Sequence, residues 1–84
     1  MSKEINGLSE DELHILIGAN VARLRKKANL SQLALSLEMG NNSPSLVSSA
    51  EIYTNNRHFN ISQLHKISII LEIDICEFFK SYNK

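Results

Sequence analysis

The chain has 84 residues, of which 43% are hydrophobic and 21% are charged, and its formal net charge is zero. This length and composition predict one soluble globular domain with a single core and no second domain. The neutral charge argues against a protein that holds nucleic acid by bulk electrostatics, since that mode needs a basic excess. The apolar stretches are too short to cross a membrane, and the first residues lack a signal-peptide pattern. A single cysteine cannot form an internal disulfide, so we expect a cytoplasmic protein with no membrane partner.

The first predicted helix begins after a short polar segment. We expect residues 1–8 to be flexible and residues 9–84 to form the folded domain. Ser9 followed by Glu12 is a capping box, which marks the start of a helix. The apolar face of this helix, about four to five turns long, is marked by Leu13, Ile17, Val21, Leu24 and Ala28.

Two short helices are predicted in the middle of the chain. One runs from about Ser31, a good N-cap, to Met39, and Gly40 can adopt the positive φ that ends a helix. The other runs from about Pro44 to Tyr53, with Ser43 as its cap. Two helices joined by a glycine-containing turn form the helix-turn-helix unit, whose second helix enters the major groove of DNA.

The rest of the chain is predicted to be a loop followed by two more helices. The loop covers residues 54–59, and Asn60 with Gln63 forms a second capping box that opens a fourth helix. Asp74 with Glu77 repeats the pattern before a last short helix. Because no β alternation persists, the predicted fold is all-α, a compact bundle of about five helices.

No pattern in the sequence indicates catalysis or metal binding. The three histidines and Cys76 do not have metal-ligand spacing, and neither a nucleophile elbow nor a phosphate-cradling glycine loop is present. We therefore predict that the protein is not an enzyme and needs no cofactor or metal. Cys76 is expected to be a small buried apolar residue.

Between residues 17 and 79 the chain resembles the lambda-repressor-like (Cro/CI-type, XRE) helix-turn-helix family. The resemblance rests on the run Leu30-Ser31-Gln32, the series Leu35, Ser36, Met39 and Gly40, the pair Val47 and Glu51, and the ending 71–79. In such a fold Leu35, Ser36, Met39, Val47 and Ala50 are expected to be core, with Ser36 small because two helices cross there. The resemblance implies a lambda-repressor-like bundle that binds double-stranded DNA.

The sequence departs from the family pattern at two places. The segment 40–43 holds one residue more than the family turn, and polar Asn41 stands where an aliphatic residue is usual. Tyr53 replaces the glycine that commonly follows the recognition helix, so Asn55 or Asn56 is expected to be the left-handed residue there.

The resemblance also implies roles for single residues. Arg25 and Glu51 match a family ion pair that braces the recognition helix, and the alternative is that Arg25 faces phosphate with its basic neighbours. Gln32 matches a position that hydrogen-bonds a phosphate oxygen.

Serine and asparagine dominate the predicted DNA-reading surface. The base-contact candidates are Asn41, Asn42, Ser43, Ser45, Ser48 and Ser49. Asparagine pairs with adenine whereas serine accepts several bases, so we expect modest direct readout. The alternative is that these residues only suit a helix start. The candidates for phosphate contacts, which position the protein without reading sequence, are Gln32, Arg23, Lys26, Lys27, Arg57 and His58.

These features predict a dimeric transcriptional repressor that occupies a palindromic operator. Few cations are available, so one subunit should bind weakly and a homodimer should span two half-sites. A short terminal helix cannot bury three rings, so at least one of the dimer-interface candidates Phe78, Phe79 and Tyr82 is expected to point outward. The alternative for Phe78 and Phe79 is that they close the core, which is expected of at least one of them. The alternatives are an antitoxin or restriction-control protein that acts with a protein partner, and a helical adaptor that has lost DNA binding.

Overall fold

The structure, a computed structural model, describes residues 7–81 and contains only helices and turns within that range. Its four α-helices and two 3-10 helices are α1 (Glu10–Lys27), α2 (Gln32–Glu38), α3 (Ser45–Glu51), η2 (Thr54–Asn56), α4 (Ile61–Leu71) and η3 (Ile75–Phe79). The all-α prediction is confirmed, but the last predicted helix is a 3-10 turn. Most of the segment predicted to be flexible, residues 1–6, lies outside the described residues, as does Tyr82.

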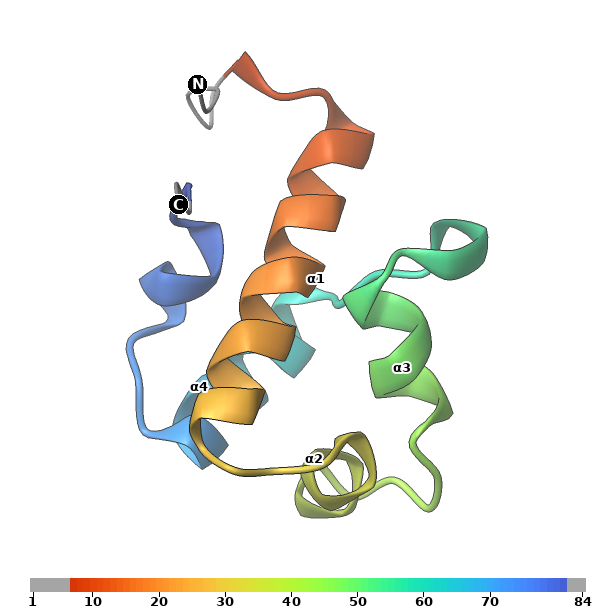
Figure 1. Cartoon of the computed structure of the whole chain (residues 1–84). Coiled ribbons are helices and arrows are strands. Elements are labelled where there is room, and N and C mark those ends of the chain that lie inside the picture. Colours follow the sequence, from red (N-terminus) through yellow and green to blue (C-terminus); the bar gives the residue numbers. More distant parts are fainter. Residues whose placement is uncertain (1–6, 82–84) are drawn as a thin grey trace.

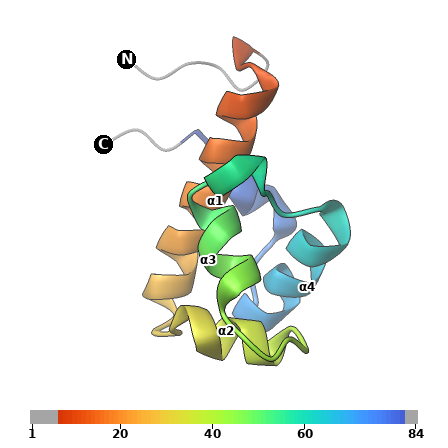
Figure 2. The ribbon, with the colours of Figure 1, turned by 90° about the vertical axis from the view of Figure 1, so that its right-hand side faces the viewer.

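The long helix α1 is the central element of the fold. In Figure 1, α3 lies on one side of α1 and η3 on the other, while α2 crosses near the C-terminal end of α1. Figure 2, turned by 90°, shows α3 in front of α1 and α4 to its side. None of the helices in the described part of the chain is both long and apolar enough to cross a membrane.

Local side-chain bonds fix where most helices begin. The Ser9 hydroxyl accepts from the Glu12 N–H at 3.1 Å, and the Ser9 N–H donates to the Glu12 carboxylate at 2.9 Å. Asn60 and Gln63 form the same reciprocal pair at the start of α4. Both predicted capping boxes are therefore confirmed. The Ser31 hydroxyl accepts from the Ala34 N–H at 2.9 Å, which confirms the predicted cap of α2.

The start of η3 differs from its prediction. Asp74 accepts a hydrogen bond from the Cys76 N–H at 2.8 Å, but the Glu77 carboxylate pairs with Lys80 at 2.7 Å instead of returning to Asp74. The predicted third capping box was therefore wrong. The prediction that Cys76 is buried was also wrong, because this residue is exposed. Its hydrogen bond with Asp74 raises the pKa of the Cys76 thiol, which disfavours the reactive thiolate.

The helix α2 is terminated by Gly40 in a left-handed conformation, as the sequence predicted. Gly40 has a φ of +93°, its N–H donates to the Leu37 carbonyl, and the Asn41 N–H donates to the Ser36 carbonyl. This double closure is a Schellman motif. The same pattern ends α1 at Asn29 and α4 at Glu72, where the left-handed residue is not glycine.

One core lies between α1, the α2–α3 pair, α4 and η3. Its largest members with almost no exposure are Phe78, Leu35, Leu64, Ile67, Val21 and Val47. Asn20 lies among them, and its side-chain amide donates to the carbonyls of Phe78 and Lys80 at 2.8 and 2.9 Å. Asn20 therefore ties the end of the described chain to α1. Phe78 is fully buried in the core, so its prediction as a dimer-interface residue was wrong, whereas Phe79 is half-buried.

Candidate nucleic-acid interface

The helices α2 and α3 pack against each other across buried small and apolar side chains. Leu35 and Ser36 of α2, and Val47 and Ala50 of α3, are all buried, as predicted. Ser36 has no exposed surface, so a larger side chain there would separate α2 from its neighbours. The connection between the two helices runs from Met39 to Pro44.

The start of α3 corrects one detail of the sequence analysis. Pro44, not Ser43, occupies the N-cap position, and it makes no side-chain cap bond. The Ser43 hydroxyl accepts weakly from the Ser45 N–H at 3.2 Å and shares a hydrogen bond with the Ser45 hydroxyl at 2.9 Å. The helix also ends at Glu51, earlier than the predicted Tyr53.

A buried ion pair joins α1 to α3. The Arg25 guanidinium donates to both carboxylate oxygens of Glu51, at 2.7 Å from Nε and 3.0 Å from Nη2. The two side chains are only 7% and 2% exposed. Arg25 also donates to the Leu30 carbonyl at 2.8 Å. The pair expected from the sequence is formed, and the alternative in which Arg25 faces phosphate was wrong.

Gln32 completes this network from α2. Its side-chain amide donates to Glu51 at 2.9 Å, and the residue is half-buried. Three side chains from α1, α2 and α3 therefore fix one another, and the desolvated carboxylate of Glu51 is fully paired. The side-chain amide of Gln32 is thus engaged within the protein. No observation tests the predicted phosphate contact by this residue, which remains a prediction.

The close approach of α1 and α3 depends on Gly18. This residue was not among those predicted to be important. A Cβ atom at this position would lie 2.6 Å from the carbonyl oxygens of both Ala50 and Glu51. Only glycine fits where the backbones approach this closely. The sequence did contain an indication of this contact. A single glycine inside a strongly periodic helix is less favourable than alanine, and close packing is one reason for its presence.

The outer face of α3 is polar at its start and apolar at its end. Ser45, Ser48 and Ser49 share this face at helical spacing with Ile52, which directly follows α3 and is 75% exposed. The Ser48 hydroxyl donates to the Ser45 carbonyl at 3.2 Å. None of these four side chains is charged. Ile52 was not among the predicted site residues, although its helical spacing from Ser45 and Ser48 places it on their face.

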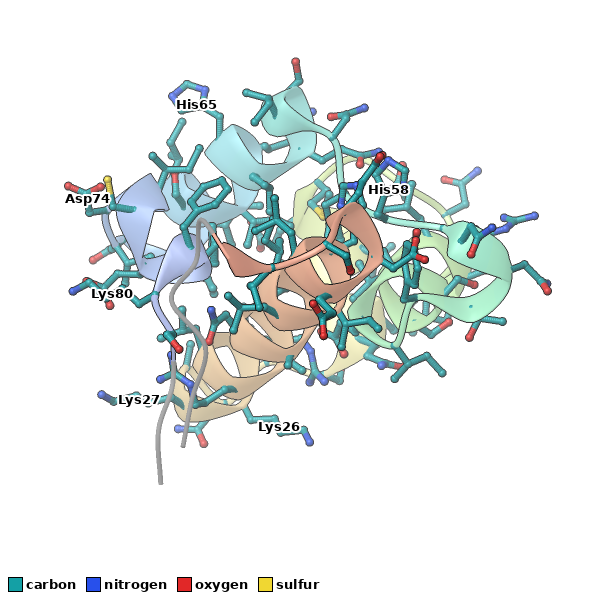
Figure 3. All side chains as sticks on the ribbon, turned by 90° about the horizontal axis from the view of Figure 1, so that it is seen from above. Lys26, Lys27, His58, His65, Asp74 and Lys80 are labelled. Carbon is teal, nitrogen blue, oxygen red and sulfur yellow. The ribbon has the colours of Figure 1, made fainter. Side chains whose placement is uncertain are left out.

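The basic residues near the end of α1 are not gathered beside α3. Arg23 is half-buried and donates to Asn20 at 3.3 Å, on the side of the C-terminal segment. Lys26 and Lys27 are exposed, and Figure 3 shows them projecting from the side of α1 opposite to His58. Of the cationic candidates, Arg57 is the one that the structure places next to α3.

A groove of about 370 Å³ lies between α3 and the loop that follows it. It is lined by Ser45, Leu46, Ala50, Asn56, Arg57 and His58, none of which is acidic. Asn42 and Ser43, in the turn before α3, are exposed, whereas Asn41 is half-buried. The outer face of α3, this turn and the groove form one surface with hydroxyl, amide and guanidinium groups, which we name the α3 surface.

A cluster that the sequence did not predict joins α1 to the loop after α3 and consists of Asp11, His14, Tyr53 and His58, of which His58 also lines the groove. The rings of His14 and His58 stack with their centroids 3.8 Å apart. The Tyr53 hydroxyl donates to Asp11 at 2.6 Å, and this bond raises the pKa of Tyr53 to about 12. His58 was predicted to contact phosphate, but its ring is stacked on α1. No local pattern relates positions so far apart in the chain.

No protein-family model matches the chain, and no curated protein matches it. Within residues 7–81, no group of three or more histidine, cysteine, aspartate or glutamate side chains is arranged to hold a metal ion. A proposal for the function therefore depends on the sequence and geometry of this chain.

Proposed function

We propose that this protein is a lambda-repressor-like helix-turn-helix regulator that binds double-stranded DNA in a sequence-specific manner. In this proposal α3 is the recognition helix and lies in the major groove. The protein acts as a homodimeric repressor on a palindromic operator. The observation that carries the proposal is α3 itself, whose inner face is held by a buried ion pair while its outer face presents three uncharged polar side chains.

The fixed orientation of α3 supports this proposal. Base recognition needs side chains at defined positions, and the Arg25, Gln32 and Glu51 network holds α3 against α1 and α2 without using its outer face. The absence of a side chain at Gly18 lets α1 support α3 at backbone contact. The helix is therefore preorganised for docking.

The chemistry of the α3 surface supports DNA more than a purely apolar partner. Serine hydroxyls and asparagine amides form hydrogen bonds with base edges, and Ile52 offers an apolar group of the kind that contacts a thymine methyl. Arg57 supplies the charge for a phosphate contact. Direct readout by such short side chains is modest, so DNA shape contributes to specificity.

The neutral charge supports a dimer. A single α3 surface carries one guanidinium group, and phosphate contacts supply most of the affinity of DNA-binding proteins. Two copies related by a two-fold axis double these contacts and match two half-sites. Phe79 is the described residue that remains a candidate for the dimer interface.

A helical adaptor that binds a protein is the second candidate. Ile52 favours it, because a side chain that is 75% exposed at the end of an uncharged helix face also suits a protein contact. The two proposals differ in the salt dependence of binding, which is steep for DNA and weak for an apolar contact.

The test is binding of duplex DNA at low salt by the wild-type chain and two matched variants. Ser45→Glu adds a negative charge to the α3 surface, and His65→Glu adds the same charge at an exposed position on α4. We expect Ser45→Glu to weaken binding at least tenfold and His65→Glu to change it less than threefold. Equal effects of the two variants, or no binding by the wild type, would contradict the proposal.

A further inference from the structure

The loop after α3 contains a tyrosine in a backbone conformation that this residue type disfavours. Tyr53, Asn55 and Asn56 have φ values of 58°, 53° and 62°, in the left-handed region. Asparagine adopts this region more readily than other L residues, whereas tyrosine rarely does. Figure 1 shows this part of the chain projecting beyond the end of α3. A left-handed tyrosine in a projecting loop persists only where contacts from elsewhere in the fold hold it.

Those contacts come from α1 and hold both ends of the loop. At the first end, the Tyr53 hydroxyl donates to Asp11 at 2.6 Å. At the other end, the His58 ring stacks on His14, with centroids 3.8 Å apart and planes inclined by 20°. The ring of Tyr53 also lies 5.7 Å from that of His14. We name Asp11, His14, Tyr53 and His58 the loop clamp.

Two further bonds hold the backbone between the ends of the clamp. The Nδ1 atom of His58 lies 3.0 Å from the Asn56 carbonyl oxygen, to which it donates when protonated at that atom. The Arg57 N–H donates to the Thr54 carbonyl at 3.0 Å. Arg57 is therefore held on both sides, while its side chain is exposed and lines the groove with Ser45.

We propose that the loop clamp is a positioning device that directs Arg57 toward a phosphate of the DNA strand next to α3. This inference rests on the proposed function. In it His14 and Tyr53 are positioning residues and do not touch DNA. A long side chain such as arginine contributes most to binding when its backbone is fixed before the complex forms. The clamp would supply that fixation from α1, the helix that also supports α3.

The consequence is a measurable coupling between the clamp and Arg57. Each phosphate contact contributes a slope of about 0.9 in log affinity against log salt, so a fourfold rise in salt weakens binding about 3.5-fold per contact. Arg57→Gln should remove one phosphate contact per subunit and lower the salt slope by the amount that this contact contributes. His14→Ala should lower the salt slope by most of that amount, although His14 itself does not contact phosphate. The double variant should lose no more than Arg57→Gln alone.

The experiment is a double-mutant cycle on the full chain, with dissociation constants measured at two salt concentrations on the best duplex selected from a random pool. Tyr53→Phe is a second test of the clamp, because it removes only the hydroxyl that binds Asp11. His65→Ala is the matched control, since His65 is exposed on α4. Circular dichroism and thermal unfolding establish that each variant is folded before its affinity is compared.

The outcomes separate this inference from the proposed function. Non-additive losses in the cycle, with a lower salt slope for His14→Ala and Tyr53→Phe but not for His65→Ala, support the clamp. If the wild-type chain binds DNA but the losses add, or the clamp variants keep the wild-type salt slope, the positioning role is overturned and the proposed function stands. If the wild-type chain binds no duplex, both are overturned.

Discussion

Gly18 shows how one missing side chain sets the distance between two helices. A Cβ atom there would lie 2.6 Å from the carbonyl oxygens of Ala50 and Glu51, which belong to the backbone and cannot rotate away. Alanine is better than glycine in a helix by about 1 kcal/mol, but forcing atoms into a packed site costs about 1–3 kcal/mol and often more when backbone must shift.

We therefore expect Gly18→Ala to lower the free energy of unfolding, by about 1–3 kcal/mol. Urea denaturation monitored by circular dichroism measures this change. Ser62→Ala, at an exposed position on α4, is the control and should have almost no effect. A Gly18→Ala variant that is more stable than the wild type would show that α1 and α3 do not approach as described.

Tyr53 provides a second prediction at the scale of one residue. The hydrogen bond to Asp11 raises the pKa of its phenol from 10.0 to about 12. Since the phenol holds its proton more tightly in the folded chain, this contribution to stability is complete below pH 10 and is lost as the pH rises toward 12.

Absorbance titration of Tyr82→Phe, in which Tyr53 is the remaining tyrosine, measures this pKa directly. We expect a midpoint of about 12, and a midpoint close to 10 when Asp11→Asn is added to the same chain. A midpoint near 10 before Asp11 is changed would mean that the hydrogen bond between Tyr53 and Asp11 does not form.

At the scale of the element, α3 depends on the network that pairs Glu51. Removing Arg25 would leave a buried carboxylate without its cation, which costs about 3–5 kcal/mol in comparable pairs. We expect Arg25→Met to lower the free energy of unfolding by this amount and to weaken DNA binding through loss of the α3 orientation. Lys26→Met, which changes an exposed neighbour, should alter stability by about 0.5 kcal/mol or less.

Urea denaturation of the two variants measures the difference, and the double variant Arg25→Met with Glu51→Leu separates the causes. Replacing both partners removes the unpaired charge, so the double variant should be more stable than Arg25→Met alone. Equal stability of Arg25→Met and Lys26→Met would indicate that the ion pair is not buried.

The elements that the sequence predicts well are those whose ends depend on neighbouring residues. Ser9 with Glu12, Asn60 with Gln63, and Gly40 act within one helical turn, and all three mark helix ends correctly. Tyr53 was not expected to adopt a positive φ, since Asn55 or Asn56 was predicted to replace the glycine there. All three are left-handed, because contacts of the loop with α1 outweigh the preference of a tyrosine.

Only part of the candidate site could be predicted, because some of its contacts join residues that are far apart in the chain. The Arg25 and Glu51 pair was expected from the family resemblance, and the shared face of Ser45, Ser48 and Ser49 follows from helical spacing. The stack of His14 on His58 depends on how α1 and the loop pack, so no local pattern indicates it. Phe78, Phe79 and Tyr82 were grouped as interface candidates because a short helix was not expected to bury all three rings. Phe78 is the phenylalanine that closes the core, whereas Phe79 is half-buried, and sequence alone could not distinguish the two neighbours.

In the molecule as a whole the net charge is zero, but the basic side chains are unevenly distributed over the surface. Lys26 and Lys27 project from the side of α1 opposite to His58, and Lys27 lines a hollow with Leu71 and Glu77. Arg57 lies beside α3 instead. If DNA binds the α3 surface, Arg57→Glu should weaken binding to every duplex much more than Lys27→Glu does, and a titration of one labelled duplex compares them. Equal effects would place the DNA elsewhere on the molecule.

Selection of bound duplexes from a random DNA pool determines whether two α3 helices read a palindromic operator. The proposed function predicts an enriched consensus with two-fold symmetry, whose half-sites are centred about 10 base pairs apart, bound by two copies of the chain. Its affinity should fall steeply as salt is raised. A pool in which no duplex is enriched, with negligible binding even at low salt, would contradict the claim and direct attention to a protein partner for Ile52 and the α3 surface.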